Sequence, residues 1–314
     1  MILSIVLIVV GLAILVFGAN LLVEGAVELS ERYGVSKIVV GLTVVAFGTS
    51  TPELVVNIIS AIKKQSEINL GNIVGANIHN IALIIGIASF LNPLVIDKKF
   101  ITRDTPFVIF ASVIFLLAGL ISTQISRVDA IIFLVCFSCF IYYHAKSVVD
   151  DYQEFKKIGK VKKKQIYKVF LHIFIGILLL WVGGELTVRN SVNFAKALKI
   201  PISLIAIVVI SNGTSLPELV ASIVAWKKKH SGIALGNILG SNVFNIFFVL
   251  GISGLISPLD IYKWFFIDGL VMIFVTLVFM GFISFKKERV LDKSAGAIFL
   301  FMYLTYIIYV IVRK

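Results

Sequence analysis

The sequence predicts an all-α membrane protein with ten transmembrane helices, arranged as two inverted-topology repeats of five helices each. The chain of 314 residues is 59% hydrophobic and only 15% charged, and its mean hydropathy is +1.03. A soluble domain carries about 25% charged residues and could not bury so much apolar surface. Two sequence motifs also recur at a constant distance along the chain, which indicates an internal repeat.

Long apolar runs account for the hydrophobicity. Ten of them are present: Ile2–Val23, Ile38–Ile62, Leu70–Phe90, Phe107–Ile121, Ala130–His144, Val169–Leu186, Ile202–Trp226, Ile233–Ile256, Trp264–Phe285 and Ala295–Val312. A helix needs roughly 20 apolar residues to cross the core of a bilayer, so ten spans fit, the fourth and fifth being short. The first run lacks a basic start and a small-residue cleavage site, so we expect a first span and not a signal peptide.

The net charge of +12 is explained by the placement of the basic residues. If the N-terminus faces outward, 20 of the 29 lysines and arginines fall in the connections on the inner side. Eight of these are lysines between residues 146 and 168. The positive-inside rule therefore predicts that both termini lie outside and that this central linker lies in the cytoplasm. We expect a multi-pass protein of the plasma membrane. We therefore expect the protein to lie in the lipid bilayer and not to bind nucleic acid.

The repeat divides the chain into two similar halves. Residues 48–55 recur as 213–220 and residues 71–81 as 236–246, both at an offset of 165, and 22 of the 40 positions from Gly48 to Ile87 match their counterparts. Five spans per half make the second half enter the membrane from the opposite side, and such inverted repeats place a substrate site near the midplane. We therefore predict a first repeat over 1–145, a linker over 146–168 and a second repeat over 169–314.

The first motif, Gly-Thr-Ser-x-Pro-Glu, predicts a break in a membrane span. Proline lacks a backbone donor and clashes with the carbonyl four residues earlier, here that of Gly48 or Gly213. Irregular backbone at membrane depth is tolerated only against protein or a wet cavity. The glutamate that follows each proline can point its carboxylate into that cavity.

Glu53 and Glu218 are the acids that lie deep inside predicted spans, and no basic residue lies equally deep to pair with them. A charge at the centre of a membrane helix costs roughly 2.5–3.5 kcal/mol, which indicates a functional role. Carboxylates, hydroxyls, amides and freed carbonyls are the oxygen ligands that Ca2+ prefers, and Mg2+ fits less well because it demands stricter geometry. Two carboxylates also neutralise one divalent ion.

The second motif places asparagines on one helix face in each half, since residues three and four apart are neighbours. We assign Asn80 and Asn245 to cation ligation. We expect the remaining amides to form hydrogen bonds between helices. We expect the motif glycines to allow helices to approach each other closely. These residues are Asn72, Asn77, Asn237 and Asn242, and Gly71, Gly75, Gly236 and Gly240.

Together the two motifs resemble the alpha repeats of the cation/Ca2+ exchanger superfamily, closest to its prokaryotic Na+/Ca2+ exchanger branch. The resemblance covers both repeats and implies a secondary-active antiporter that exchanges Ca2+ for Na+ at shared central sites by alternating access. It extends the ligand role to Thr49, Ser50, Glu53, Asn80, Thr214, Ser215 and Glu218, with the two threonines acting chiefly through their carbonyls. Ser241 matches a serine used for Na+, and Ala46 and Ser211 match positions whose carbonyls face the cavity.

Three departures from the family pattern concern the site. Ala76 stands where some members have a serine, and Asn245 stands where several have an aspartate, so two acids remain instead of three. Asn212 takes the place that Phe47 has in the first half. A neutral Asn245 argues by resemblance against co-transport of K+. His79 is interpreted as a packed neutral histidine, with a proton-sensing role as the alternative.

Other functions remain as alternatives at this stage. A Ca2+/H+ antiporter of the same fold would need Glu53 or Glu218 to titrate, and a cation channel, which fits less well, would need a continuous pore. No nucleophile–base constellation or phosphate loop indicates an enzyme, and we expect no cofactor and no obligatory protein partner. Cys136 and Cys139 are interpreted as small packing residues without a disulfide.

Overall fold

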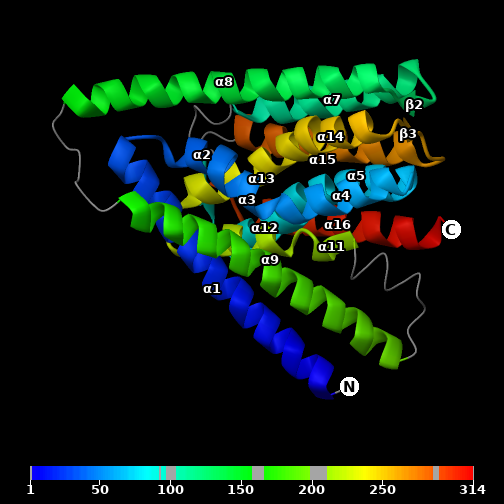
Figure 1. The fold of residues 1–314 in the computed structure, drawn as a ribbon, viewed down its shortest axis with the longest axis horizontal. Coiled ribbons are helices and arrows are strands. Elements are labelled where there is room, and N and C mark those ends of the chain that lie inside the picture. Colours follow the sequence, from blue (N-terminus) through cyan, green and yellow to red (C-terminus); the bar gives the residue numbers. More distant parts are fainter. Residues whose placement is uncertain are drawn as a thin grey trace.

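Helices make up nearly all of this computed structural model, which describes residues 2–91, 93–96, 104–157, 166–198, 211–285 and 290–313 (Figure 1). The first half contains α1 (Ile2–Tyr33), α2 (Lys37–Val40), the π-helix η1 (Gly41–Val45), α3 (Ala46–Thr49), α4 (Thr51–Ile62), α5 (Ser66–Ile78), the π-helix η2 (His79–Ile85), α6 (Gly86–Leu91), β1 (Leu94–Val95), α7 (Thr105–Ile121), β2 (Gln124–Ile125) and α8 (Arg127–Lys157). The second half contains α9 (Ile166–Ala197), α11 (Ser211–Gly213), α12 (Leu216–Lys227), α13 (Ser231–Val243), the π-helix η5 (Phe244–Val249), α14 (Leu250–Ile256), β3 (Leu259–Asp260), α15 (Phe265–Phe285), β4 (Val290–Leu291) and α16 (Lys293–Val312).

Seven helices in the described part of the chain are long and apolar enough to cross a membrane. An eighth results if Lys37–Thr49 and Thr51–Ile62, which meet at a bend of 48°, form one broken span. The 17-residue α7 is a shorter apolar helix. The predicted run Ile202–Trp226 is described only from residue 211 onward, so one of the ten predicted spans lies partly outside the described residues.

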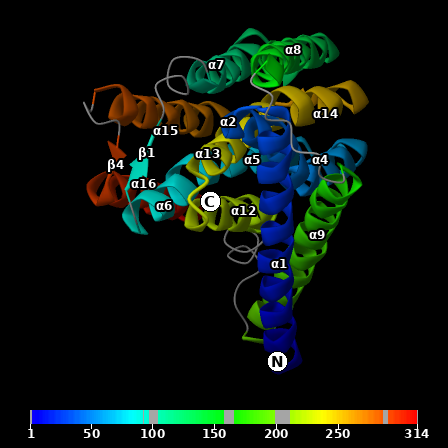
Figure 2. The same ribbon diagram turned by 90° about the vertical axis from the view of Figure 1, so that its left-hand side faces the viewer.

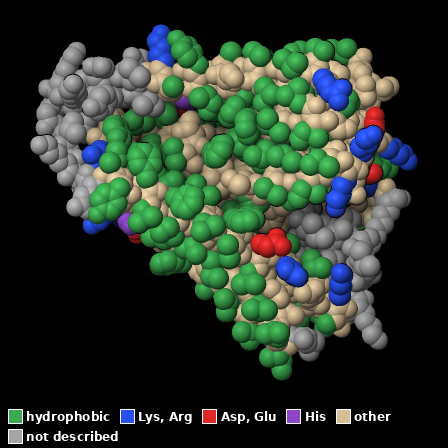
Figure 3. All heavy atoms as spheres, viewed as in Figure 1, with side chains coloured by type: hydrophobic (Ala, Val, Ile, Leu, Met, Phe, Trp, Pro, Cys, Tyr) green, Lys and Arg blue, Asp and Glu red, His purple; other side chains and the backbone are tan. Residues whose placement is uncertain are grey.

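The outer surface of the bundle is apolar, as lipid contact requires. Many large hydrophobic side chains are exposed, among them Ile121, Phe174 and Phe301, which are 85%, 67% and 70% exposed. Figure 3 shows hydrophobic side chains over much of one face, with sparse charges that lie mainly toward the ends of the helices. A soluble protein rarely exposes so large an apolar area. The surface is therefore that of a multi-pass membrane protein.

The helices of the second half recur at the sequence offset of 165 residues. Adding 165 to the bounds of α4 and α5 gives the bounds of α12 and α13, and η2 and η5 both begin at this offset. The long first helices follow the same rule to within one residue, since α1 begins at Ile2 and α9 at Ile166, 164 residues later. The internal repeat of the sequence is therefore also a repeat of secondary structure.

α1 and α9 lie side by side and run in opposite directions (Figures 1 and 2). A Cβ added at Gly11 would lie 3.0 Å from the carbonyl oxygen of Gly183, and one at Gly18 would lie 2.9 Å from that of Gly176. At the offset of 165, Gly11 corresponds to Gly176 and Gly18 to Gly183. The two contacts are therefore copies of each other, as a two-fold axis between the halves requires.

The two halves are also interleaved. α8 of the first half packs against η5 and α14 of the second, and α16 of the second half packs against η2 and α6 of the first. Two short antiparallel pairs, which the all-α prediction did not include, cross between the halves in the same way. β1 pairs with β4, and β2 pairs with β3. Each half therefore completes its packing with the last helix of the other.

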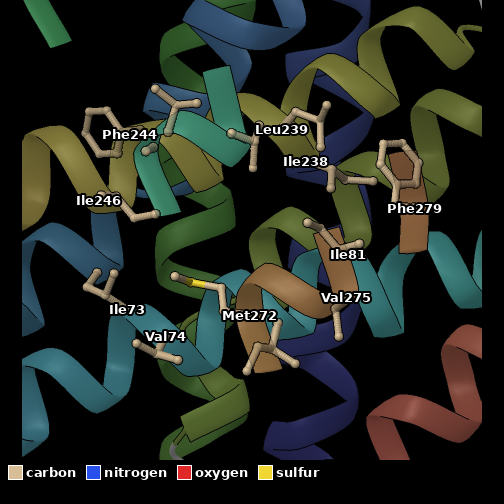
Figure 4. Close-up of a cluster of buried hydrophobic side chains, with 14 of the residues drawn as sticks. Ile73, Val74, Ile81, Ile238, Leu239, Phe244, Ile246, Met272, Val275 and Phe279 are labelled. Carbon is tan, nitrogen blue, oxygen red and sulfur yellow. The ribbon is translucent and has the colours of Figure 1, made fainter. Parts of the chain in front are cut away.

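The centre of the molecule is filled by α5, η2, α13, η5 and α15. Figure 4 shows side chains of these helices meeting in one apolar cluster, including Ile73, Ile81, Ile238, Phe244 and Met272. A second cluster joins α1 and α9 to α12, with Leu15, Leu22 and Ala221 buried in it. The broken spans are thus held between two apolar clusters.

α8 continues beyond the predicted end of the fifth span at His144 and ends at Lys157. The predicted linker over 146–168 is therefore helical in its first part. Charged residues do not end a helix when propensity allows it to continue, and Glu, Lys and Gln are good helix formers.

We predict that Gly18→Leu destabilises the protein by loosening the contact between α1 and α9. A Cβ at Gly18 would meet the carbonyl oxygen of Gly176 at 2.9 Å, and overpacking of this kind costs about 1–3 kcal/mol. The midpoint of thermal unfolding in detergent, followed by size-exclusion chromatography, should fall by several degrees. Gly281→Leu is the control, because no described atom lies within 4 Å of its Cβ position. Equal midpoints for the two variants would contradict the close contact.

Candidate functional site

The Gly-Thr-Ser-x-Pro-Glu motifs break their helices as predicted. α3 ends at Thr49 and α4 begins at Thr51, with Ser50 between them at φ −86° and ψ 11°. Ser215 precedes α12 with almost the same geometry, φ −87° and ψ 7°. Pro52 and Pro217 lie in the first turn of their helices, where the missing N–H needs no partner. Each glutamate therefore lies in the first turn of a helix that begins deep inside the bundle.

The asparagine motifs run into π-helices, which the sequence analysis did not predict. α5 continues without a break into η2 at His79, and α13 continues into η5 at Phe244. Widened turns of this kind are rare and are frequently found at functional sites. They place Asn80 and Asn245 in the first turn of the π-helical segments.

The two glutamates are buried and hydrogen-bonded across the repeats. Glu53 and Glu218 are both 0% exposed. Ser50 Oγ donates to Glu218 Oε1 at 2.7 Å, and Ser215 Oγ donates to Glu53 Oε1 at 3.1 Å. The serine at the break of one repeat therefore donates to the glutamate of the other repeat. One carboxylate oxygen of each glutamate accepts this hydrogen bond, and the second oxygen has no hydrogen-bond partner among the described residues.

The central asparagines form a reciprocal network between α5 and α13. Asn77 Nδ2 donates to the carbonyl of Asn242 at 3.2 Å, and Asn242 Nδ2 donates to the carbonyl of Asn77 at 3.2 Å. Asn80 Nδ2 donates to Asn242 Oδ1 at 2.9 Å, and Asn245 Nδ2 donates to Asn77 Oδ1 at 3.1 Å. The amide nitrogens are used in this network, whereas the amide oxygens of Asn80 and Asn245 are not.

The other two motif asparagines brace the broken turns. Thr49 Oγ1 donates to Asn237 Oδ1 at 2.9 Å, and Asn237 Nδ2 donates to Ser222 Oγ at 3.0 Å. In the other half, Thr214 Oγ1 donates to Asn72 Oδ1 at 3.4 Å, and Asn72 Nδ2 donates to Asn57 Oδ1 at 2.9 Å. The hydrogen-bonding role predicted for Asn72, Asn77, Asn237 and Asn242 is thus confirmed. The hydroxyls of Thr49 and Thr214 are thus engaged in hydrogen bonds to the opposite half.

Several oxygens of the predicted site have no hydrogen-bond partner among the described residues. Buried polar atoms are almost always paired, so such groups require an explanation. Five of them come from the predicted ligands: Glu53 Oε2, Glu218 Oε2, Asn80 Oδ1, Asn245 Oδ1 and Ser241 Oγ. All five residues are at most 1% exposed. A donor set of two carboxylates, two amide oxygens and a hydroxyl matches the chemistry of a hard cation.

The other residues that the sequence singled out lie on α3, α5 and α11 or directly after α11. Ala46 is buried at 1% exposure on α3, and Ala76 is buried on α5. Thr214 is half-buried, and Ser211 lies in α11, its side chain being outside the described residues. Sequence reasoning missed Asn57 and Ser222. Their signal was present, because both are polar, lie in apolar spans and correspond at the offset of 165.

The motif glycines differ between the halves. A Cβ at Gly236 would lie 2.4 Å from the carbonyl oxygen of Ile38, and one at Gly240 would lie 2.4 Å from that of Leu42. The predicted close approach is therefore confirmed for these two glycines. No described atom lies within 4 Å of the Cβ position of Gly71. The residue that corresponds to Ile38 in the second half is Ser203, which is outside the described residues.

A recess of about 210 Å³ lies elsewhere, near the ends of α1, α9 and α12, and Glu24, Glu28, His172, Lys228 and His230 line it together with two valines. Lys228 Nζ lies 2.8 Å from Glu24 Oε1. Burial lowers the pKa of the His230 imidazole, and the nearby Lys37 ammonium lowers this pKa further. No motif residue lines this recess, and the described residues contain no group of three or more His, Cys, Asp or Glu arranged to hold a metal.

Comparisons with known proteins agree with the arrangement. The family model described as sodium/calcium exchanger protein matches residues 3–146 and 168–312, one match in each half. The sodium/calcium exchanger MaX1 of Methanosarcina acetivorans is 30% identical over 95% of both chains. The inner membrane protein YrbG of Escherichia coli is 31% identical over 89% of this chain and 88% of its own length.

The fold matches that of a solved exchanger. A structure of the sodium-calcium exchanger NCX_Mj, soaked with zero Na+ and Ca2+, superposes with a TM-score of 0.82 at 28% sequence identity. The superposition covers 98% of this chain and 99% of that chain. Another structure of the same exchanger, soaked with 100 mM Na+ and 10 mM Sr2+, superposes with a TM-score of 0.81.

Proposed function

This chain belongs to the sodium/calcium exchanger family, whose members are transporters and not enzymes, and we propose that it exchanges Ca2+ for Na+ across the plasma membrane by alternating access to one central site. The members of this family transport ions and use no cofactor. Na+ and Ca2+ are therefore the substrates of the proposal.

The observation that carries the proposal is the pair of buried glutamates with one engaged oxygen each. Ser50 and Ser215 donate to Glu218 and Glu53, and the second carboxylate oxygens are unpartnered among the described residues. Two carboxylates left alone in an apolar bundle repel each other and lose their hydration. A bound divalent cation, or Na+ ions in its place, offsets both costs.

The proposed cation ligands extend the set of unpartnered oxygens. Ca2+ takes roughly six to eight oxygens, which carboxylates, amides, hydroxyls and carbonyls can supply together. Carbonyls of the broken turns are the natural additions, because a helix that ends inside the bundle leaves some carbonyls without intrahelical partners. The carbonyl of Ala46 already accepts from the backbone N–H of Ser50 at 3.0 Å and would contribute its other lone pair. The full proposed set is Glu53, Glu218, Thr49, Ser50, Asn80, Thr214, Ser215, Asn245, Ser241, Ala46 and Ser211.

An inverted arrangement of two five-span repeats is the architecture that we propose for alternating access. The antiparallel course of α1 and α9 supports it, as do the matching contacts of Gly11 and Gly18. The first repeat would cover 1–145 and the second 169–314, with the segment 146–168 in the cytoplasm and both termini outside. In such transporters one part moves relative to the other around a fixed central site.

We expect radiolabelled Ca2+ to accumulate in proteoliposomes only when they are loaded with Na+. The reason is that Na+ binds to the same oxygens as Ca2+, so the outward movement of Na+ returns the site to the side from which Ca2+ is taken up. Loading with K+ in place of Na+ should give no uptake. Adding K+ to the external Ca2+ buffer should leave the Na+-driven uptake unchanged, in line with the neutral Asn245. Uptake driven equally well by a pH gradient in Na+-free buffer would instead identify a Ca2+/H+ antiporter.

Glu53→Gln and Glu218→Gln should each abolish Ca2+ exchange while the protein still folds. Each variant removes one charge, and unit charges about 4 Å apart interact by roughly 4 kcal/mol at an effective dielectric constant of 20. Exchange should therefore fall by about 100-fold or more, and by a similar factor in both variants because the halves share one site.

Glu67→Gln is the matched control for this experiment, since Glu67 is exposed in the first turn of α5. It should exchange Ca2+ at the parental rate. Thermal unfolding midpoints of Glu53→Gln and Glu218→Gln should equal or exceed that of the parent, because a neutral side chain is easier to bury. The midpoint of Glu67→Gln should match that of the parent. Normal transport by Glu53→Gln alone would refute a shared two-carboxylate site.

The membrane orientation can be tested at two equivalent turns. Lys64 and Lys229 correspond at the offset of 165, are exposed, and both adopt positive φ, 55° and 62°. In a background without Cys136 and Cys139, an impermeant thiol reagent should label Lys64→Cys in intact cells and Lys229→Cys only in inside-out vesicles. Labelling of both from the same side would contradict the inverted repeats.

A further inference from the structure

The central site is nearly symmetric, but the two flanks beside it differ. The residue directly before the Gly-Thr-Ser motif differs between the halves, being Phe47 in the first half and Asn212 in the second. Each asparagine of the site is likewise preceded by a different residue, His79 before Asn80 and Phe244 before Asn245. In the folded molecule these four residues meet in pairs across the repeats.

On one flank the contact is aromatic. The ring centroids of Phe47 and Phe244 lie 5.3 Å apart at 73°, and those of Phe47 and Phe248 lie 6.4 Å apart. Phe137 of α8 packs against Phe244 at 5.7 Å and against Phe248 at 5.0 Å. We call these residues, Phe47, Phe137, Phe244 and Phe248, the aromatic cluster.

On the other flank the contact is polar. His79 Nδ1 lies 2.9 Å from Asn212 Oδ1, and the hydroxyl of Tyr303 donates to the same oxygen. Because an amide oxygen only accepts, His79 carries its proton on Nδ1 and donates as well. His79 and Tyr303 also pack edge to face with ring centroids 5.7 Å apart. We call His79, Asn212 and Tyr303 the polar triad.

The aromatic cluster and the polar triad occupy related places. Each joins the broken turn of one repeat to the π-helix of the other, η5 in the first case and η2 in the second. Each is completed by the last helix of a repeat, with Phe137 on α8 and Tyr303 on α16. Inverted repeats place such equivalent contacts on opposite sides of the midplane.

We propose that the polar triad and the aromatic cluster are positioning residues that close the central site toward opposite sides of the membrane, and that their different chemistry makes the two sides unequal. The inference rests on the proposed exchange by alternating access. With two identical repeats, the site would face both sides equally often. The difference between these two contacts removes that equality.

The direction of the inequality follows from hydration. Phe47 is 52% exposed, but Phe244 beside it is only 3% exposed. Water that enters past the aromatic cluster therefore contacts mainly the ring of Phe244, and this costs free energy in proportion to the newly exposed apolar area. Water that enters past the polar triad can replace the hydrogen bonds of Asn212 and Tyr303, so little is lost. The site should therefore open more often toward the side of the polar triad. With both termini outside, Asn212 precedes Glu218 in a span that enters from outside, which makes this the external side.

Apparent affinity reports the inequality, because it scales with the fraction of carriers that are competent to bind on a given side. Initial rates of Na+-dependent Ca2+ exchange in right-side-out and inside-out vesicles give an apparent KM for each side. The parent should have the lower KM on the side of the polar triad. The ratio of the two KM values is the quantity to follow.

Exchanging residues between the flanks tests the proposal. His79→Phe with Asn212→Phe makes both flanks aromatic and should move the KM ratio toward one by roughly threefold or more. Phe47→Asn with Phe244→His makes both flanks polar and should do the same. Combining all four substitutions should invert the ratio, a result that loss of stability alone does not produce.

Conservative variants keep the test decisive if the exchanged proteins do not fold. Tyr303→Phe removes one hydroxyl from the polar triad and should shift the ratio in the same direction as His79→Phe with Asn212→Phe, by a smaller factor. Ser138→Ala is the control, since Ser138 is the exposed counterpart of Tyr303 on α8 and donates within its own helix to Leu134. An unchanged ratio in Tyr303→Phe and in every exchanged variant that transports Ca2+ would overturn the proposal. A parent without Na+-dependent uptake would instead refute the proposed function.

Discussion

The rest of the structure depends on the need to hold two carboxylates at the centre of an apolar bundle. Glu53 and Glu218 are fully buried, and each would be prohibitively costly without partners. The fold supplies these partners crosswise, because the serine of one break donates to the glutamate of the other. Neither repeat can satisfy its own acid, so the pair of repeats is the smallest unit in which the site exists.

The same crosswise rule extends outward from the glutamates. Asn77 and Asn242 exchange identical hydrogen bonds, and Thr49 and Thr214 each reach an asparagine of the other half. Membrane helices gain little from apolar contact with one another, since lipid is equally apolar, and therefore rely on close packing and interhelical hydrogen bonds. The central asparagine network provides the interhelical hydrogen bonds. Gly236 and Gly240 provide close packing in the second half.

Local chemistry made most of the site predictable from sequence. The breaks at Ser50 and Ser215 follow from a proline two residues later, and the burial of the acids follows from the apolar spans around them. The widened turns at Asn80 and Asn245 were not predictable, because a π-helix has no composition that separates it from an α-helix. Tyr303 was missed because its partner Asn212 is 91 residues away and no motif marks it. The extension of α8 was missed because hydropathy reports the end of a membrane span and not the end of a helix.

The exchange of last helices between the repeats has a consequence for biosynthesis. α8 emerges from the ribosome before η5 and α14, the helices against which it packs, have been made. Until the second half is made, the first half therefore lies in the membrane with the contact face of α8 unpacked and with Glu53 lacking the hydrogen bond from Ser215. A chain truncated after the first half cannot reach its native packing alone, and quality-control proteases should recognise it as unfinished. Co-expression of the separate halves, in contrast, offers each of them the missing helix.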